Sequence, residues 1–236
     1  MEQIFFPHSE RGHANFGWLD SYHSFSFGNY YDPNKVHFGM LRVLNDDVVE
    51  ASMGFGTHPH ENMEIISIPL SGELAHKDST GTNGVILTGD VQIMSAGSGI
   101  RHSEFNHSSS KKVNFLQIWI LPKKLNIEPR YEQKTFKEYD KKNKWCTVVS
   151  PNDSQAVWIN QDATFSLSSL EPGSPLKYTL TNSNHGVYIF LISGKITLSG
   201  QTLERRDAIG LWDIKEFEIN AEVKSEILCI EVPMIR

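Results

Sequence analysis

Hydrophobic residues fall in short runs along the whole chain. Each run is rich in β-branched, aromatic and aliphatic residues and is bounded by Gly, Asn, Asp, Ser or Pro, which is typical of short strands joined by turns. The clearest predicted strands span residues 36–43, 64–70, 85–94, 114–121 and 187–192. No long stretch keeps the 3.6-residue apolar spacing of a helix, and only residues 134–144 could hold a turn or two. The pattern predicts an all-β sandwich or barrel.

A weak internal repeat indicates two halves. Residues 69–74 (PLSGEL) and 191–196 (LISGKI) each consist of an apolar strand, a Ser-Gly turn and another apolar residue. Each is followed by an acidic turn and a further strand, with Asp90 in the first copy and Asp207 in the second. The lysine-rich stretch 122–144 is interpreted as a solvated connection, because acidic residues interrupt it. We therefore expect two tandem β-barrels, spanning residues 1–128 and 129–236.

Composition and charge exclude several classes of protein. Of the 236 residues, 39% are hydrophobic and 21% are charged, which permits a sizeable core and argues against disorder. The net charge of −6 disfavours nucleic acid as a partner. The longest apolar run, 187–192, is far shorter than the ~20 residues that cross a membrane, and no signal-like stretch follows the N-terminus. Cys146 and Cys229 lie too far apart for a disulfide scaffold, so we expect a cytoplasmic protein with no membrane partner.

The candidate chemistry is concentrated in one region, since half of the ten histidines lie between positions 58 and 107. In an extended strand, side chains at positions i and i+2 point to the same face. His58 and His60 can therefore direct two imidazoles into one barrel interior, and His102 and Glu104 can do the same from another strand. Three imidazole nitrogens and one carboxylate oxygen suit Fe(II), Ni(II), Co(II), Mn(II) or Zn(II). The pattern predicts a metal site.

Glu64 offers an alternative carboxylate for this site. It lies four residues after His60 and faces the same side if the strand continues that far. The residues alone therefore allow a ligand set completed by Glu64 as readily as one completed by Glu104. His76 and His107 each lie near a turn, and we interpret both as surface residues or as neighbours of the ligands.

The glycines and histidines of this region resemble the two sequence motifs of the cupin superfamily. The first motif, Gly, His-x-His, Glu and Gly, is matched by Gly54, His58-Pro59-His60, Glu64 and Gly72. The second is matched by Gly89, Ser95-Ala96-Gly97, His102 and Asn106. It departs from the usual pattern in having Ser for Pro and two extra residues before the histidine.

Those extra residues, within 94–104 (MSAGSGIRHSE), are similar to the pirin family of the cupins. Residues 11–13 (RGH), 17–27 (GWLDSYHSFSF), 117–119 (QIW) and 129–132 (PRYE) also resemble pirins. The resemblance covers about residues 10–133 and is closest to the bacterial pirin-like quercetinases. It implies a bicupin, with two tandem cupin (double-stranded β-helix, or jelly-roll) barrels. It also implies one metal ion, usually iron, held in the N-terminal barrel by His58, His60, His102 and Glu104, with Glu64 as a neighbour.

The second half carries none of these imidazoles. When the two halves are aligned on the repeat, Leu180, Asn182 and Ile219 fall at the positions of the three histidines. We therefore expect the C-terminal barrel to hold no metal. His185 is interpreted as a loop or hydrogen-bonding histidine.

The resemblance implies a quercetin 2,3-dioxygenase activity. A flavonol would bind at one divalent ion, expected to be Fe2+, and dioxygen would cleave its ring with release of carbon monoxide. Four protein ligands leave up to two positions open on an octahedral metal. Glu104 is the expected catalytic proton acceptor, with Glu64 as the second candidate. The expected partners are a small planar polyphenol and dioxygen, and the expected state is a monomer.

Two other interpretations stay open. Some pirins are redox-responsive partners of transcription factors, so the chain is alternatively a non-catalytic, iron-dependent regulator that binds a protein partner. A zinc-dependent isomerase or hydrolase on the same barrel is the third interpretation. Bound iron without turnover would favour the regulator, and bound zinc without dioxygen consumption would favour the third.

Overall fold

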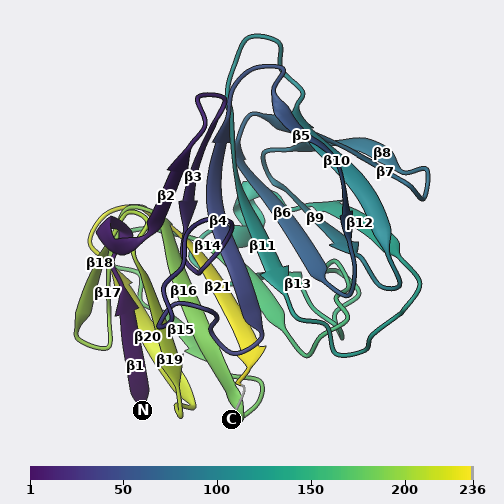
Figure 1. Cartoon of the computed structure of the whole chain (residues 1–236). Coiled ribbons are helices and arrows are strands. Elements are labelled where there is room, and N and C mark those ends of the chain that lie inside the picture. The colour runs from purple at the N-terminus through teal and green to yellow at the C-terminus, as the bar shows by residue number, and fades with distance from the viewer. Residues whose placement is uncertain (235–236) are drawn as a thin grey trace.

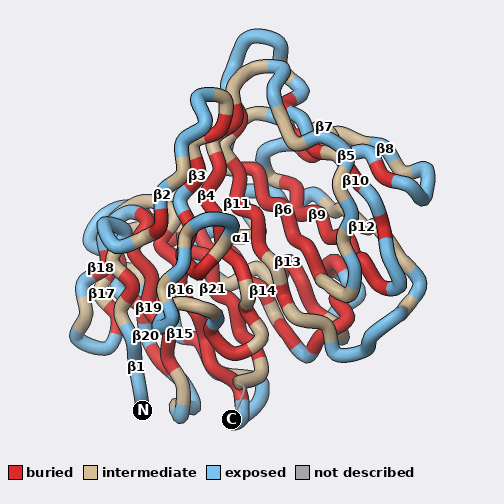
Figure 2. Tube along the Cα trace, in the orientation of Figure 1, coloured by how far each residue is buried: buried red, intermediate tan, exposed pale blue. Residues whose placement is uncertain are grey.

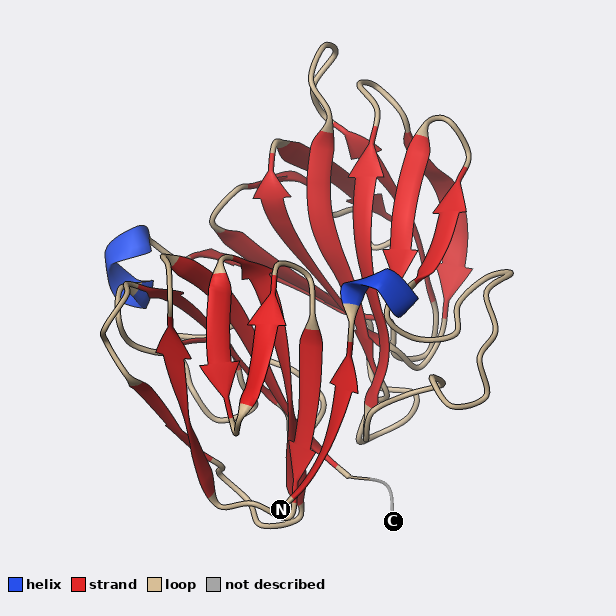
Figure 3. Cartoon of the chain, turned by 90° about the vertical axis from the view of Figure 1, so that its left-hand side faces the viewer, coloured by secondary structure: helices blue, strands red, loops and turns tan. Residues whose placement is uncertain are grey.

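The computed structural model describes residues 1–234, which consist almost entirely of strands and loops (Figure 1). The described strands form four sheets. A seven-stranded and a four-stranded sheet make up the N-terminal half, and a six-stranded and a four-stranded sheet make up the C-terminal half. Figure 3 shows the two halves as separate stacks of strands. The predicted all-β organisation in two parts is confirmed.

The N-terminal half contains the strands β2 (Gly12–Asn15), β3 (Leu19–His23), β4 (Leu41–Val49), β5 (Gly54–His60), β6 (Glu64–Ser71), β7 (Glu73–Asp78), β8 (Asn83–Leu87), β9 (Asp90–Ser95), β10 (Ile100–Asn106), β11 (Val113–Ile120) and β12 (Arg130–Thr135). The seven-stranded sheet has the order β12-β9-β6-β11-β4-β3-β2, and the four-stranded sheet has the order β5-β10-β7-β8. Non-consecutive strands are therefore neighbours in both sheets, as in jelly rolls.

The C-terminal half contains β13 (Cys146–Val149), β14 (Thr164–Leu170), β15 (Leu176–Thr179), β16 (His185–Ser193), β17 (Lys195–Leu198), β18 (Gln201–Glu204), β19 (Ala208–Trp212), β20 (Glu216–Ala221), β21 (Ser225–Pro233) and the first strand of the chain, β1 (Glu2–Phe6). The six-stranded sheet has the order β1-β19-β16-β21-β14-β13, and the four-stranded sheet has the order β15-β20-β17-β18.

Two strands lie in the half opposite to the one expected from their position in the sequence. β1 pairs with β19 of the C-terminal half, and β12, which follows residue 128, pairs with β9 of the N-terminal half. The division of the chain at residues 128 and 129 therefore stays a proposal, with these two strands crossing it. A short α-helix, α1 (Glu138–Lys141), lies within the stretch expected to hold a helical turn, and a 3-10 turn spans His8–Glu10.

The largest apolar core lies between the two large sheets rather than inside either half. It joins residues of the seven-stranded sheet, such as Ile66 and Ile118, to residues of the six-stranded sheet, such as Phe165 and Phe190. Figure 2 shows the buried segments concentrated along these two sheets. Burying apolar side chains from both sheets holds the halves together as one body. Among the described residues, no helix is long and apolar enough to cross a membrane.

The interiors of the two halves differ in polarity. The C-terminal half is filled by one continuous apolar cluster that includes Ile219 and is flanked by Leu180. The N-terminal half instead contains two small apolar clusters, one around Phe115 and one around Met94. Buried polar side chains, among them His102 and Glu104, occupy the same half. This polar interior is where the sequence places its candidate chemistry.

Glu231 is a fully buried carboxylate at the end of the C-terminal core. It accepts hydrogen bonds from the Tyr178 hydroxyl at 2.8 Å and the Thr181 hydroxyl at 2.5 Å, and its contact with His185 Nδ1 is 2.8 Å. His185 is therefore a hydrogen-bonding histidine, as predicted. Together these donors compensate for taking a carboxylate out of water.

Glu231 should make the stability of the protein depend on pH. Burial opposes its ionisation, but the hydrogen bonds from His185, Thr181 and Tyr178 outweigh burial and lower its pKa. A depressed carboxyl pKa stabilises the fold above the unfolded-state pKa, and this contribution is lost as pH falls through the folded-state pKa. We expect Glu231→Gln to lower the free energy of unfolding by about 2 kcal/mol at pH 7. Urea unfolding at pH 7 and at about pH 3 should show this difference shrinking with acidity, and a difference that is equal at both pH values would contradict the account.

Candidate metal centre

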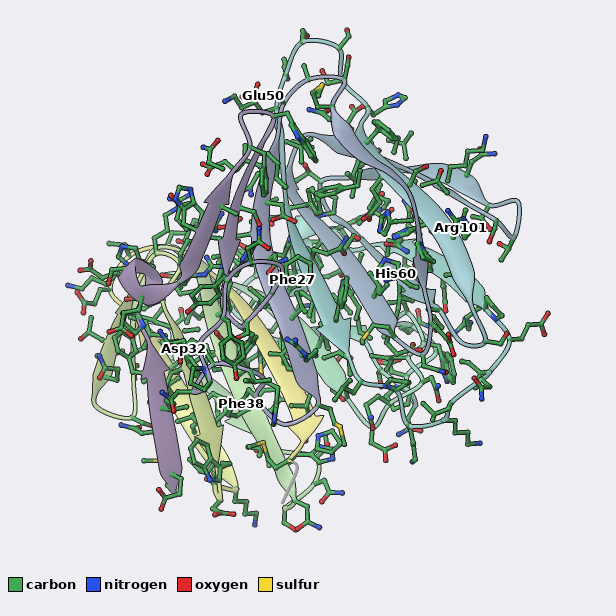
Figure 4. All side chains as sticks on the ribbon, in the orientation of Figure 1. Phe27, Asp32, Phe38, Glu50, His60 and Arg101 are labelled. Atoms are coloured by element: carbon green, nitrogen blue, oxygen red, sulfur yellow. The ribbon has the colours of Figure 1, made fainter. Side chains whose placement is uncertain are left out.

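The pairing of β5 with β10 brings three predicted imidazoles together. His58 lies directly opposite His102 in the register, and the two Nε2 atoms are 3.1 Å apart. His60 is two residues further along β5, on the same face, and its ring centroid is 4.8 Å from that of His58 and 4.9 Å from that of His102. The alternation of side chains along a strand thus produces the cluster that the sequence predicted. Arg101, between Ile100 and His102, is exposed on the outer side of β10 (Figure 4).

A bulge in β5 positions the first histidine. The register pairs His102 with His58 but Glu104 with Phe55, so β5 holds one residue more than β10 over this interval. The extra residue bends the strand locally, as bulges do. The Gly56 carbonyl oxygen in the bulge lies 2.8 Å from His58 Nδ1 and accepts the proton of that nitrogen. With Nδ1 held in this way, His58 directs its Nε2 toward the cluster.

The imidazoles of His60 and His102 are neutral at physiological pH. Burial, followed by the neighbouring imidazole of His58, lowers the pKa of His60 to about 4. Burial, followed by the neighbouring imidazoles of His58, His60 and His76, lowers the pKa of His102 to about 3. A neutral imidazole carries a nitrogen lone pair and needs no deprotonation before it binds a metal ion.

The geometry of the three imidazoles fits a divalent cation. One ring nitrogen from each of His58, His60 and His102 lies within 4.8 Å of the others. Two Nε2 atoms at 3.1 Å repel each other unless a proton or a cation lies near both. His102 Nδ1 is buried without a hydrogen-bond partner, so the protein interior does not otherwise satisfy this ring. Imidazole nitrogens without thiolates suit Fe, Ni, Co, Mn or Zn.

Glu104 lies on the same strand as His102 but is held by two other side chains. Its Oε2 accepts a hydrogen bond from Gln117 Nε2 at 2.7 Å, and its Oε1 lies 3.1 Å from the Ser67 hydroxyl. Burial raises its pKa to about 7, and the charge of Asp47 adds to this effect. One of its carboxylate oxygens lies within 4.8 Å of a ring nitrogen of His102 and of a ring nitrogen of His76. It does not belong to the group formed by His58, His60 and His102.

Glu64 is separated from the imidazoles, contrary to the alternative allowed by the sequence. β5 ends at His60, Asn62 turns the chain with a φ of 49°, and a new strand starts at Glu64. The strand alternation that would have aligned Glu64 with His60 is therefore broken. Glu64 Oε2 instead accepts hydrogen bonds from the Ser95 hydroxyl at 2.7 Å and the Asn160 backbone N–H at 3.1 Å, at the junction with the C-terminal half.

His76 is a neighbour of the site whose placement the sequence left open. It is buried on β7, opposite Glu104 in the register, and its ring centroid is 5.3 Å from that of His102. Asp78 accepts a hydrogen bond from its Nε2 at 3.0 Å, which leaves Nδ1 buried and unpartnered. The inward alternation of Leu74, His76 and Asp78 was the signal in the sequence. His107, by contrast, is exposed.

A cavity of about 800 Å³ opens beside the imidazoles. His58, His60, Glu104 and Gln117 form part of its wall. Aromatic rings form much of the remainder, in two edge-to-face pairs: Trp18 with Phe55 at 5.3 Å, and Phe27 with Trp119 at 5.4 Å between centroids. The volume is in the range of small-molecule sites, and the walls suit a flat apolar ligand with a few polar groups.

Gly54 should be essential for the approach of β5 to β10. A Cβ atom at this position would lie 2.3 Å from the Glu104 carbonyl oxygen, which no side chain tolerates. We expect Gly54→Ala to force the strands apart and to weaken metal binding on the order of tenfold. Gly56→Ala is the matched control, because a Cβ there meets nothing within 4 Å. Metal titration of both variants checks this, and equal affinities would contradict it.

Comparison with known proteins places this arrangement among related chains. The model of the pirin family matches residues 7–120, and that of the quercetinase C-terminal cupin domain matches residues 147–232. A protein of Escherichia coli K12 named quercetin 2,3-dioxygenase is 42% identical over 228 residues, covering 96% of this chain and 97% of that protein. A pirin-like protein of Caulobacter vibrioides is 37% identical over 227 residues, covering 95% of this chain and 97% of that protein.

Solved structures agree with these sequence matches. The crystal structure of YhhW from Escherichia coli superimposes with a TM-score of 0.95 at 40% identity, covering 100% of this chain and 99% of that one. The crystal structure of bacterial pirin YhhW in complex with nickel(II) superimposes with a TM-score of 0.94 at 40% identity, covering 99% and 100%.

Proposed function

This chain belongs to the pirin family and is a bicupin, and we propose that it is a metal-dependent oxidoreductase of the quercetin 2,3-dioxygenase type. The observation that carries the proposal is a cluster of three imidazoles, His58, His60 and His102, two of which (His58 and His60) line an aromatic cavity. The 42% identity to a protein named quercetin 2,3-dioxygenase supports the reaction class. Cleavage of a flavonol ring with release of carbon monoxide is the specific reaction proposed.

We propose that His58, His60 and His102 hold one divalent ion, with Glu104 as the fourth ligand. The nickel(II) complex of the related YhhW supports a divalent ion, and we propose Fe2+ in the cell. When bound, the ion supplies a Lewis acid toward a substrate oxygen and a site for dioxygen chemistry. Coordination by imidazoles alone leaves the charge of the ion unchanged, whereas the carboxylate of Glu104 would reduce the net charge of the metal centre.

Glu104 is the proposed proton acceptor for the 3-hydroxyl of the flavonol. Its carboxylate lines the cavity beside His58 and His60, where it can reach a hydroxyl group of a bound substrate. The Gln117 amide fixes the carboxylate at 2.7 Å, and the Ser67 hydroxyl lies 2.9 Å from Gln117 Oε1, which sets the orientation of that amide. A carboxylate held in this way can take up a proton without losing its position.

The cavity walls determine which substrates enter. Trp119 lies 5.0 Å from the His60 ring, so a flat molecule beside the imidazoles contacts an aromatic surface. Aromatic side chains also exclude water from the reacting centre, which strengthens the electrostatic interactions there. A planar polyphenol fulfils both conditions.

The experiment that tests the proposal is metal analysis of anaerobically purified protein, followed by dioxygen uptake on addition of quercetin. We expect one divalent ion per chain and dioxygen consumption that stops when the ion is removed by a chelator. Bound iron with no uptake for several flavonols would favour a non-catalytic regulator instead. A protein that binds no divalent metal would overturn both interpretations.

A further inference from the structure

A second polar surface lines the same cavity on the side of β3 and β4. In the register of these strands, Ser21 is opposite Asp47 and His23 is opposite Asn45. All four side chains are buried, and all four line the cavity. We call this set of four residues the β3–β4 polar face. Buried polar side chains need hydrogen-bond partners, so each donor and acceptor of this face requires one.

The hydrogen bonds form a chain that ends at His23. The Ser21 hydroxyl donates its proton to Asp47 Oδ1, so the Ser21 oxygen can only accept from His23 Nε2, which is 2.8 Å away. Burial lowers the pKa of His23 to about 4, so the ring is neutral and has one N–H. That N–H is on Nε2, and Nδ1 is therefore a lone pair. His23 Nδ1 is buried without a partner.

Asn45, the cross-strand neighbour of His23, also has an acceptor atom without a partner. This atom is its Oδ1, which is buried. The polar face thus presents two neighbouring acceptor atoms, and none of the described residues donates a hydrogen bond to either. Leaving a buried acceptor unpaired costs free energy, and a ligand that brings a donor recovers it.

Aromatic rings connect the polar face to the imidazoles. The His23 ring is 5.3 Å from Phe27, Phe27 is 5.4 Å from Trp119, and Trp119 is 5.0 Å from His60. Figure 4 labels Phe27 and His60, the two residues that precede and follow Trp119 in this series. A flat ligand lying along these rings has one end at the imidazoles and the other near the polar face.

We propose that the β3–β4 polar face binds hydroxyl groups of the substrate at the end remote from the imidazole cluster, with His23 Nδ1 and Asn45 Oδ1 accepting their protons in hydrogen bonds. This inference rests on the proposed function, because it assigns the far end of the same substrate. It restricts the substrate class to polyphenols that carry hydroxyl groups at both ends. A site built from acceptors discriminates strongly against analogues that lack the donor, because its buried groups are then left unpaired.

The test compares two flavonols that share the reacting 3-hydroxyl. Quercetin carries four further hydroxyl groups, and 3-hydroxyflavone carries none. Calorimetric titration of the metal-loaded protein without dioxygen, at pH 8, measures both dissociation constants without turnover. Burial raises the Asp47 pKa to about 7, so at pH 8 this carboxyl is ionised and accepts from Ser21. The measured quantity is the ratio of the two dissociation constants.

Two variants address the proposal by different routes. His23→Leu removes the acceptor. Asp47→Asn supplies a side-chain N–H to Ser21, whose hydroxyl then turns to His23 Nε2 and leaves the proton on Nδ1. We expect each variant to reduce the preference for quercetin over 3-hydroxyflavone about five- to tenfold. The ratio of the two constants is decisive for Asp47→Asn, because Asp47 also acts on Glu104 and that effect is common to both flavonols. His37→Leu, at an exposed histidine, is the matched control and should keep the wild-type ratio.

The possible results distinguish a failure of the polar-face assignment from a failure of the proposed function. An unchanged ratio in either folded variant overturns the assignment of the polar face while leaving the proposed function intact. If His23→Leu fails to fold in a thermal unfolding assay, the isosteric Asp47→Asn decides alone. A wild-type protein that binds neither flavonol contradicts the proposed function, and this assignment with it.

Discussion

Replacing His102 with alanine is expected to abolish stoichiometric metal binding. His102 is the histidine that β10 contributes to the cluster, and its Nε2 faces His58 Nε2 at 3.1 Å. Without it, the cluster retains two nitrogens from one strand, and the affinity should fall at least about 100-fold. Metal content after dialysis against a weak chelator measures this directly.

The matched control for this variant is His107→Ala. His107 follows the same strand, is exposed, and lies outside both groups of candidate ligands. It should keep full metal content. Because His102 is buried, circular dichroism must show that the His102→Ala variant is folded. A folded His102→Ala protein with one ion per chain would place the metal elsewhere.

Replacing Glu104 with glutamine should remove turnover while the protein keeps its fold. Glutamine has nearly the same shape, but it cannot accept the substrate proton. General-base catalysis of this kind contributes on the order of 10² to 10⁴ in rate, so kcat should fall by that factor. Dioxygen uptake under saturating quercetin measures it.

Metal analysis of the same variant separates the two roles proposed for Glu104. A loss of turnover with metal retained identifies proton transfer as the dominant role. A loss of metal identifies ligation as dominant. A Glu104→Gln protein with wild-type kcat would show that another group takes the proton.

The cluster could be predicted because it depends on short-range geometry. His58 and His60 are two residues apart in one strand, and His102 and Glu104 are two residues apart in another, so alternation alone puts each pair on one face. The extended backbone allows little freedom at that range. What the sequence could not supply was the bulge in β5, which shifts the register between the two strands.

Features that depend on contacts between distant parts of the chain were harder to predict from the sequence. The residues alone left Glu64 open as an alternative, because the end of β5 at His60 and the turn at Asn62 have no clear signal in the local pattern. The pairing of β1 with β19 joins residues from near opposite ends of the chain, such as Glu2 and Trp212, and no local pattern encodes it. His23 and Asp47 are a similar case, since their connection through Ser21 exists only once β3 pairs with β4. Packing between distant segments decides such features.

Carbon monoxide release from quercetin, by protein that has been stripped of metal and reloaded with Fe2+, reports on the reacting centre itself. We expect close to one carbon monoxide per quercetin consumed, no release from the stripped protein, and no release from the reloaded His102→Ala variant. Quercetin consumption without carbon monoxide, or equal release with and without metal, would contradict the claim that three imidazoles and one divalent ion form the reacting centre.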